Sequence, residues 1–202
     1  TEVDSNPTLG ILNPSTSLGV TTIVMGNCGF TIAPCRPADR DLTIRNLTHV
    51  EGMPLKSLQE GINWGFESFA EYMDMLVKQG VGPNVAVFCG HSSIRTYILG
   101  NDAHKRTATQ REVRQMKEIL REALKAGACG FSTTRSGQHN GEAGIPMPSR
   151  LADFDELQEL SKVLKDVGYG TLMMTKGGDT SIQEIERLAS ISGRPYLIAA
   201  LL

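Results

Sequence analysis

The chain has 202 residues and is nearly neutral, with 20 lysines and arginines against 22 aspartates and glutamates. Apolar residues make up 40% of it and charged residues 21%, a globular composition that excludes disorder for most of its length. The net charge of -2 gives no long-range reason to expect nucleic acid or an anionic membrane as a partner. The length fits one domain over residues 1–202, but a closed (β/α)₈ barrel usually takes roughly 250 residues.

Nothing in the sequence predicts export or a membrane span. Residues 1–14 are polar and lack the basic start and apolar stretch of a signal peptide, and no run approaches the ~20 apolar residues of a span. The four cysteines form no Cys-x-x-Cys motif, so we expect a reducing, cytoplasmic setting, with Cys89 and Cys129 as buried small residues. The chain stops on the apolar run 196–202, which leads us to expect a truncated fold.

Apolar runs alternate with helical patterns along the chain. In order, the sequence predicts a strand at 20–25, a helix at 66–79, a strand at 85–89, a helix after Thr109, a strand at 129–133, a helix after Asp153, a strand at 171–175, a helix after Ser181 and a strand at 196–201. Each of the last three helices opens with a capping residue followed three positions later by Glu. The strands are almost continuously apolar, as is typical of strands buried on both faces.

This alternation predicts an α/β fold with a parallel sheet and right-handed crossovers. We expect a (β/α) barrel of TIM type that is incomplete, with five to six βα units. The two long connections, residues 26–65 and 132–152, follow strands. Sites in such folds are built at the carboxyl ends of the strands, so these connections are where we look for chemistry.

The first candidate site is Gly-Asn-Cys-Gly-Phe at residues 26–30, directly after a predicted strand. Its spacing is not that of a dinucleotide-binding loop. Cys28 is placed where it could serve as a nucleophile or as a thiolate metal ligand. Composition by itself favours the other interpretation, a tight turn with an incidental cysteine.

Polar residues also follow the next strands. His91 and Arg95 could orient a carbonyl and bind a carboxylate, or His91 could cap the next element. Thr133 and Arg135 suit an anionic substrate group, or are ordinary loop residues. Lys176 could form a Schiff base, or could bridge metals once carboxylated, but such a lysine is more often solvated. The remaining histidines, His49, His104 and His139, lie in polar segments where we expect surface roles.

Residues 19–40 closely resemble a stretch of the N-acyl-D-amino-acid deacylases, the D-aminoacylase family of the metal-dependent amidohydrolase superfamily. They read Gly-Val-Thr-Thr-Ile-Val-Met-Gly-Asn-Cys-Gly-Phe-Thr-Ile-Ala-Pro-Cys-Arg-Pro-Ala-Asp-Arg, and the similarity continues through 50–54, 64–69, 90–92, 130–133 and 148–150. The resemblance implies a (β/α)₈ barrel with a small β-sandwich. It also implies zinc-assisted hydrolysis of an N-acyl-D-amino acid to the free D-amino acid and a carboxylate.

The resemblance assigns the metal ligands only in part. Cys28 matches the family cysteine that binds zinc, and Asp4 matches the aspartate of the family's His-x-His-x-Asp segment. Glu2 stands where that segment has its second histidine, and a carboxylate can also bind zinc. No histidine stands at 174–176, where the family has one, and the family's later histidine and its catalytic aspartate would fall beyond Leu202.

Two kinds of function therefore remain open at the level of sequence. The first is an amidohydrolase of linear amides, with His91, Arg95, Thr133 and Arg135 as substrate-binding candidates and zinc as cofactor. Within this first hypothesis, the alternative is a cyclic-amide hydrolase of the same superfamily. The second is a non-catalytic barrel fragment, or a divergent homologue without a full metal site.

Overall fold

The computed structural model describes residues 15–50 and 52–199. The strands are β1 (Thr22–Met25), β2 (Asn84–Gly90), β3 (Gly130–Thr134), β4 (Thr171–Thr175) and β5 (Tyr196–Ala199). The α-helices are α1 (Arg40–Val50), α2 (Leu55–Gly61), α3 (Phe69–Gln79), α4 (His91–Leu99), α5 (Gln110–Lys125), α6 (Phe154–Val167) and α7 (Ile182–Ser192). Single 3-10 turns lie at Thr16–Leu18, Asn27–Gly29, Pro37–Asp39, Gly100–His104, Glu142–Gly144 and Pro148–Leu151.

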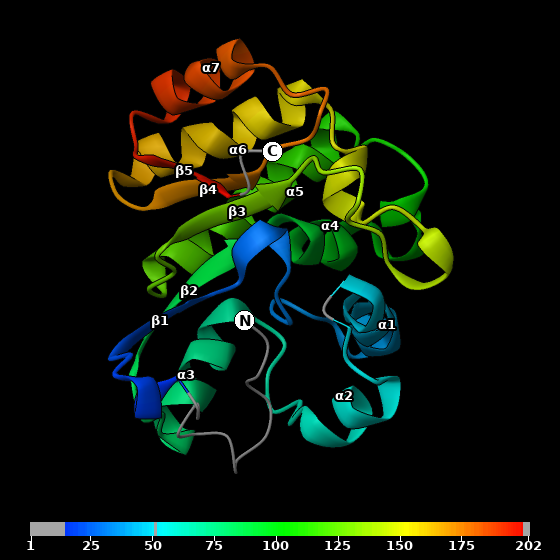
Figure 1. Ribbon diagram of the computed structural model, residues 1–202. Helices are drawn as coiled ribbons and strands as arrows, with labels where there is room; N and C mark the ends of the chain where they lie inside the picture. Colours follow the sequence, from blue (N-terminus) through cyan, green and yellow to red (C-terminus); the bar gives the residue numbers. More distant parts are fainter. Residues whose placement is uncertain (1–14, 51, 200–202) are drawn as a thin grey trace.

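The strands form one parallel sheet in the order β1-β2-β3-β4-β5 (Figure 1). Every pair is parallel, and each crossover contains at least one helix. The sheet curls like part of a barrel but does not close within the described residues. The expected incomplete barrel of TIM type is therefore confirmed.

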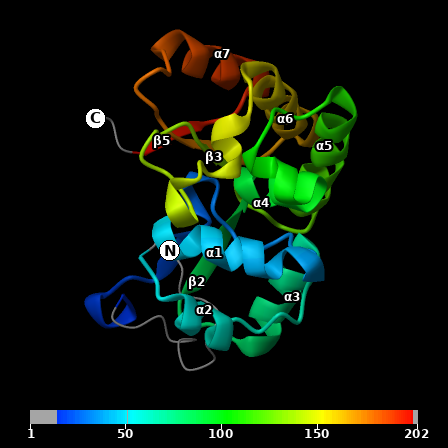
Figure 2. The same cartoon turned by 90° about the vertical axis from the view of Figure 1, so that its right-hand side faces the viewer.

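Helices cover the outer face of this sheet, as Figures 1 and 2 show for α5 and α6. Phe131 and Leu172 point outward from β3 and β4 into a core with Leu120 of α5 and Leu164 of α6. Each of these side chains is at most 1% exposed, and burying one stabilises the fold by about 1.5–3 kcal/mol. No helix in the described part of the chain is long and apolar enough to span a membrane.

The capping signals place three helices correctly. Thr109 and Ser181 form full capping boxes with the glutamates three residues later, and the Asp153 side chain accepts from the backbone N–H of Glu156. Gly168 and Gly193 end α6 and α7 in the left-handed conformation that glycine adopts without strain. Strand β4 has the predicted bounds, and the described ends of the others differ by one or two residues.

Several expectations about burial and about the connections between strands are wrong. β1 and β5 are not buried on both faces: Val24 and Leu197 are 44% and 49% exposed because these strands are the edges of the described sheet. The long connection 26–65 contains α1 and α2, and the segment after β2 is helix α4 rather than a loop. Cys129 is only partly buried, whereas Cys89 is buried as expected.

Candidate active site

The turn after β1 places Cys28 at the carboxyl end of the sheet. The 3-10 turn Asn27–Gly29 crosses from β1 over β2, β3 and β4 instead of running outward to a helix. Cys28 has φ +59° and ψ 9°, which is left-handed backbone at a residue with a side chain. Such a conformation persists only where its surroundings hold it, and it is common at functional sites.

Glycines let the turn lie directly on the strands. Gly26 has φ +77°, and a Cβ there would stand 2.8 Å from the carbonyl oxygen of Phe88. A Cβ on Gly90, the last residue of β2, would stand 2.7 Å from the carbonyl oxygen of Gly29. Both contacts are closer than van der Waals packing allows, so the turn can occupy this place only when residues 26 and 90 are glycine.

Hydrogen bonds then fix the turn on β3 and β4. Ser132 accepts from the backbone N–H of Gly29 at 3.1 Å and donates to the carbonyl oxygen of Gly26 at 2.5 Å. The Cys28 N–H donates to the sulfur of Met173 at 3.3 Å, and the hydroxyl of Thr175 donates to the Cys28 sulfur at 3.0 Å. The thiol therefore lies over the inner face of the sheet, partly exposed, at the end where barrel sites form.

The other three thiols are unsuited to chemistry at neutral pH. Burial raises the pKa of Cys35 and of Cys129 to about 11, and it raises the pKa of the fully buried Cys89 further still. A protonated thiol is a poor nucleophile and a poor metal ligand. The four cysteines all lie in the described part of the chain and form no disulfide.

The described residues do not complete a metal site. A catalytic zinc takes about three protein ligands and keeps one position open. Among residues 15–50 and 52–199, no three His, Cys, Asp or Glu side chains gather closely enough to hold a metal ion. Cys28 is one possible ligand, and Glu2 and Asp4 lie outside the described residues. No catalytic step through a metal follows from the side chains that the structure describes.

His91 and Arg95 meet on a buried glutamate. The carboxylate of Glu156 bonds His91 Nε2 at 2.7 Å on one oxygen and the Arg95 guanidinium on the other. Thr133 bonds His91 Nδ1 at 2.8 Å, and Arg95 also donates to the carbonyl oxygen of Arg106 at 2.8 Å. His91, Arg95 and Thr133 are each 0% exposed. These side chains therefore tie α4 to α6 and β3, outside the inner face of the sheet.

In the cluster of His91, Arg95 and Glu156, only Arg95 and Glu156 are charged. Burial lowers the pKa of His91, against the pull of Glu156, so the imidazole is neutral at pH 7. Burial disfavours the ionised form of Glu156, but the hydrogen bond from His91 and the charge of Arg95 keep its pKa below the ordinary value. An ionised Glu156 facing a permanently charged Arg95 is a buried salt bridge.

The other candidates lie nearer the surface. Arg135 follows β3, pairs with Asp179 at 3.5 Å, and keeps 21% of its side chain exposed. The Lys176 ammonium group donates to the neighbouring carbonyl oxygen of Gly177 at 3.3 Å. His49 is exposed as expected, but His104 and His139 are half-buried and hydrogen-bonded, which corrects their surface assignment. The sequence pattern predicts only a helix-capping role for Glu156. It does not reveal the partners His91 and Arg95, because they lie more than 60 residues earlier in the chain.

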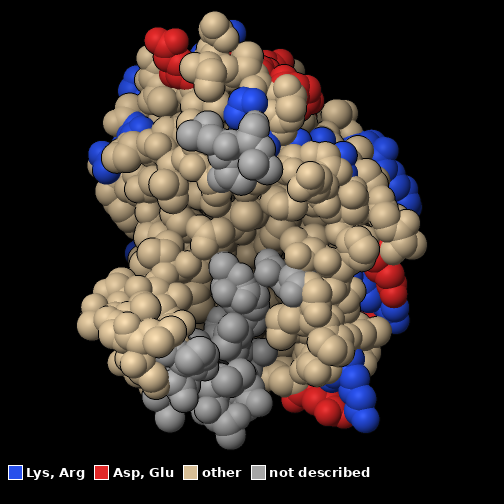
Figure 3. Space-filling view, in the orientation of Figure 1, with Lys and Arg blue, Asp and Glu red and all other residues tan. Residues whose placement is uncertain are grey.

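Charged side chains lie mainly at the edges of the face shown in Figure 3. Among the described atoms there, Lys and Arg lie around the rim of the face, and its middle carries few charges.

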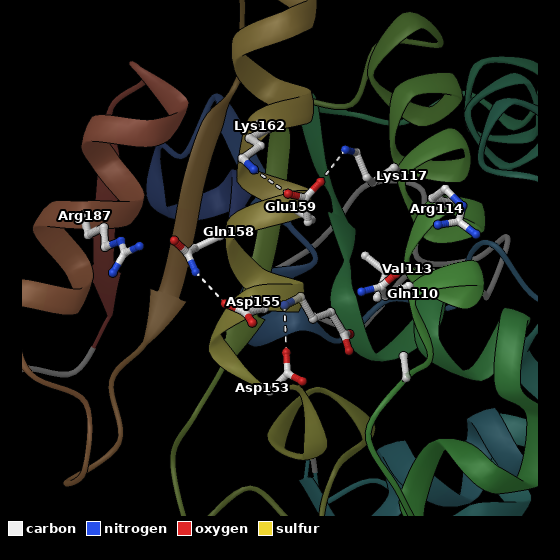
Figure 4. Close-up of a pocket in the computed structure, with 12 residues that line it drawn as sticks. Gln110, Val113, Arg114, Lys117, Asp153, Asp155, Gln158, Glu159, Lys162 and Arg187 are labelled. Atoms are coloured by element: carbon white, nitrogen blue, oxygen red, sulfur yellow. Dashed lines mark hydrogen bonds and ion pairs between the residues drawn. The ribbon is translucent and has the colours of Figure 1, made fainter.

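A separate surface cavity of about 740 Å³ lies on the helical side, lined by α5, α6 and α7 (Figure 4). Lys117 and Lys162 both point to Glu159 there, so their charges are already paired. The lining of this cavity includes neither Cys28 nor the residues that bond the cysteine turn, and we assign it no reaction.

The fold can be compared with those of known proteins. No protein-family model matches the chain. A D-aminoacylase from Alcaligenes xylosoxydans xylosoxydans is 32% identical over 168 residues, which are 82% of this chain and 30% of that protein. A crystal structure of D-aminoacylase, described as defining a subset of amidohydrolases, superposes with a TM-score of 0.72 at 27% identity, covering 96% of this chain and 38% of that one. The chain is a homologue of the D-aminoacylases.

A second solved structure extends this relation. N-acyl-D-glutamate deacylase from Bordetella bronchiseptica, complexed with zinc and a phosphonate that mimics the tetrahedral intermediate, superposes with a TM-score of 0.67 at 25% identity. It covers 95% of this chain and 37% of that one. The resemblance to the N-acyl-D-amino-acid deacylases, and the barrel fold that it implied, are confirmed. This D-aminoacylase homologue spans less than a third of the length of the curated relative.

Proposed function

We propose that the protein carrying these residues is an amidohydrolase that cleaves the linear amide of N-acyl-D-amino acids. The similarity to D-aminoacylase supports the type of reaction, and the turn that carries Cys28 supports a reaction site at the carboxyl end of the sheet. The observation that carries most weight is the thiol of Cys28, held in left-handed backbone over the carboxyl ends of β3 and β4. A single thiol so fixed at the site end of a barrel is an arrangement suited to ligation rather than to packing.

The cofactor belongs to the same proposal, with zinc as the metal and Cys28 as the ligand that the described residues supply. Glu2 and Asp4 are the further candidates from this chain. A bound zinc ion would polarise the acyl carbonyl and lower the pKa of water, which is the chemistry that amide hydrolysis needs. The zinc-bound structural neighbour supports this choice of metal. We also infer that residues 1–202 form one partial barrel domain. A cytoplasmic setting is in line with the absence of a disulfide among the four cysteines.

Substrate recognition by this chain rests best on Arg135. Of the four substrate-binding candidates it alone keeps a partly exposed side chain, because His91, Arg95 and Thr133 are fully buried. Its partner Asp179 is 72% exposed on its side chain and can be exchanged for a substrate carboxylate in water. Arg135→Gln should raise KM for an N-acyl-D-amino acid while changing kcat little, because a guanidinium binds the carboxylate alike in ground and transition states.

Zinc content tests the assignment of Cys28. The purified protein is measured by plasma mass spectrometry as Cys28→Ala and, as the matched control, as Cys129→Ala, which removes another partly buried thiol. We expect the first variant to lose zinc and the second to keep it. Equal zinc content in the two variants would remove Cys28 from the site.

Hydrolysis of N-acetyl-D-methionine, with N-acetyl-L-methionine as control, tests the reaction itself. Zinc-dependent release of the D-amino acid alone is the expected result. The absence of a complete ligand set among the described residues favours one competing outcome, a scaffold without catalysis. No hydrolysis of either enantiomer by zinc-loaded protein would support that outcome, and hydrolysis of a cyclic imide in its place would point to the related class of substrate.

A further inference from the structure

His139 is a fixed side chain at the same end of the sheet as Cys28. Its Nδ1 lies 2.7 Å from the hydroxyl of Thr134, the last residue of β3. Its backbone carbonyl accepts from the N–H of Met147 at 3.2 Å and from the guanidinium of Arg150 at 3.3 Å. The loop after β3 thus holds the imidazole from both its ring and its backbone, although the segment is polar in sequence.

Two observations place His139 next to the cysteine turn. Thr134 and Thr175 are register partners in β3 and β4, so their side chains point to the same face of the sheet. Thr175 bonds the Cys28 sulfur and Thr134 bonds His139, which puts the two groups over neighbouring strands. The ring of Phe30, two residues after Cys28, meets the His139 ring edge-on with centroids 5.0 Å apart.

The contact with Thr134 bears on which nitrogen of His139 carries the proton. The Thr134 hydroxyl oxygen accepts from the backbone N–H of Ser136 at 3.1 Å, and it can either donate its own proton to Nδ1 or accept from a protonated Nδ1 through its second lone pair. When the hydroxyl donates, Nδ1 is unprotonated and Nε2 carries the hydrogen. Burial and the nearby charge of Arg150 lower the pKa of His139, which keeps the ring neutral at pH 7. Nε2 has no hydrogen-bond partner among the described residues and is not sealed from solvent.

We propose that His139 contacts the substrate, its Nε2–H donating a hydrogen bond to the acyl oxygen of the scissile amide beside Cys28. This inference rests on the proposed amide hydrolysis. A neutral N–H donor suits a carbonyl oxygen that gains negative charge as the amide is attacked. The substrate carboxylate calls for a cation, and Arg135, the residue after Thr134, supplies one.

Nitrogen-15 NMR of the imidazoles tests the inference without relying on turnover. The chain has only four histidines, so His→Gln variants at each position assign every ring. We expect His139 to show a protonated Nε2 and an unprotonated Nδ1, and its Nε2 signal to shift on addition of N-acetyl-D-methionine. The exposed His49 serves as the control ring and should not shift. A protonated Nδ1, or no shift of His139 at the highest soluble substrate concentration, would overturn the inference.

Kinetics in zinc-loaded protein separate a contact with substrate from a structural role. His139→Gln keeps an N–H donor near the position of Nε2, whereas His139→Phe keeps the ring and loses the donor. We expect the Phe variant to lower kcat by about 100-fold with little change in KM, and the Gln variant to recover much of that loss. Equal kcat for wild type and the Phe variant would refute the contact. A substrate-induced shift of His139 in a protein that hydrolyses nothing would refute the proposed reaction and leave the contact standing.

Discussion

The nearly isosteric substitution Glu156→Gln should strongly lower the free energy of unfolding of this protein. The substitution keeps the size of the side chain, the N–H that Asp153 caps and one hydrogen bond to His91. It removes the counter-ion of Arg95, whose side chain is 0% exposed and whose Nε already has no partner among the described residues. Breaking a buried pair in this way costs about 3–5 kcal/mol, because a charge is left without compensation.

The retained bond to His91 puts the expected loss near the lower limit, about 3 kcal/mol. With a urea m-value of about 2 kcal/mol per molar, the unfolding midpoint should fall by roughly 1.5 M. The matched control is Glu159→Gln, one turn further along α6. There the carboxylate is 37% exposed between two lysines, and the change should cost less than about 1 kcal/mol.

The assay is equilibrium urea unfolding of both variants, followed by circular dichroism. Equal midpoints for Glu156→Gln and Glu159→Gln would refute the view that the buried pair holds α4 to α6. A double replacement, Arg95→Met with Glu156→Leu, should recover part of the loss, because it removes both charges from the interior. A double variant as unstable as Glu156→Gln would show that the lost hydrogen bond to His91 and the shape of the site, rather than charge, dominate at this position.

Three further outcomes are expected from the same structure. Burial lowers the pKa of His104 in the folded state, so the unfolded chain takes up a proton first. Stability should therefore fall as pH drops below 6.5, and less steeply in His104→Gln, as urea midpoints measured against pH would show. Ser181→Ala should cost about 1 kcal/mol by removing the cap of α7, whereas Ser190→Ala, exposed within the same helix, should be near neutral; a matched loss in both would contradict the capping argument. Gly90→Ala should cost about 2 kcal/mol, because its Cβ would press on the turn that holds the cysteine, and an unchanged melting temperature would disprove that close contact.

The parts of the fold that sequence could predict are those governed by local signals. Ser181 begins its helix at the expected residue because a capping box is a property of four neighbouring residues. The run 171–175 is a strand with the expected bounds because Gly170 precedes it and its residues are apolar or β-branched. Such signals do not depend on what the rest of the chain does.

Helix α4 shows why other parts could not be predicted. Its buried residues are mostly polar, and Gly90 before it offers no capping side chain, so neither an apolar stripe nor a cap announces the helix. Arg95 is a reasonable carboxylate ligand by residue type, and it does bind a carboxylate. That carboxylate is Glu156, which lies 61 residues further along the chain. Only the folded chain brings the two together.

The order of the sheet bears on how the protein forms. β1 to β5 follow one another in space as they do in sequence. Each strand from β2 to β5 therefore pairs with the strand completed just before it, and none of these described strands must wait for a distant segment or be threaded between two others. A chain leaving the ribosome from its N-terminus can add one strand-helix unit at a time to an existing edge, so synthesis itself supplies the order of assembly. The cysteine turn is the exception: it is made early, after β1, but its bonds to Ser132, Met173 and Thr175 form only once β3 and β4 have joined the sheet.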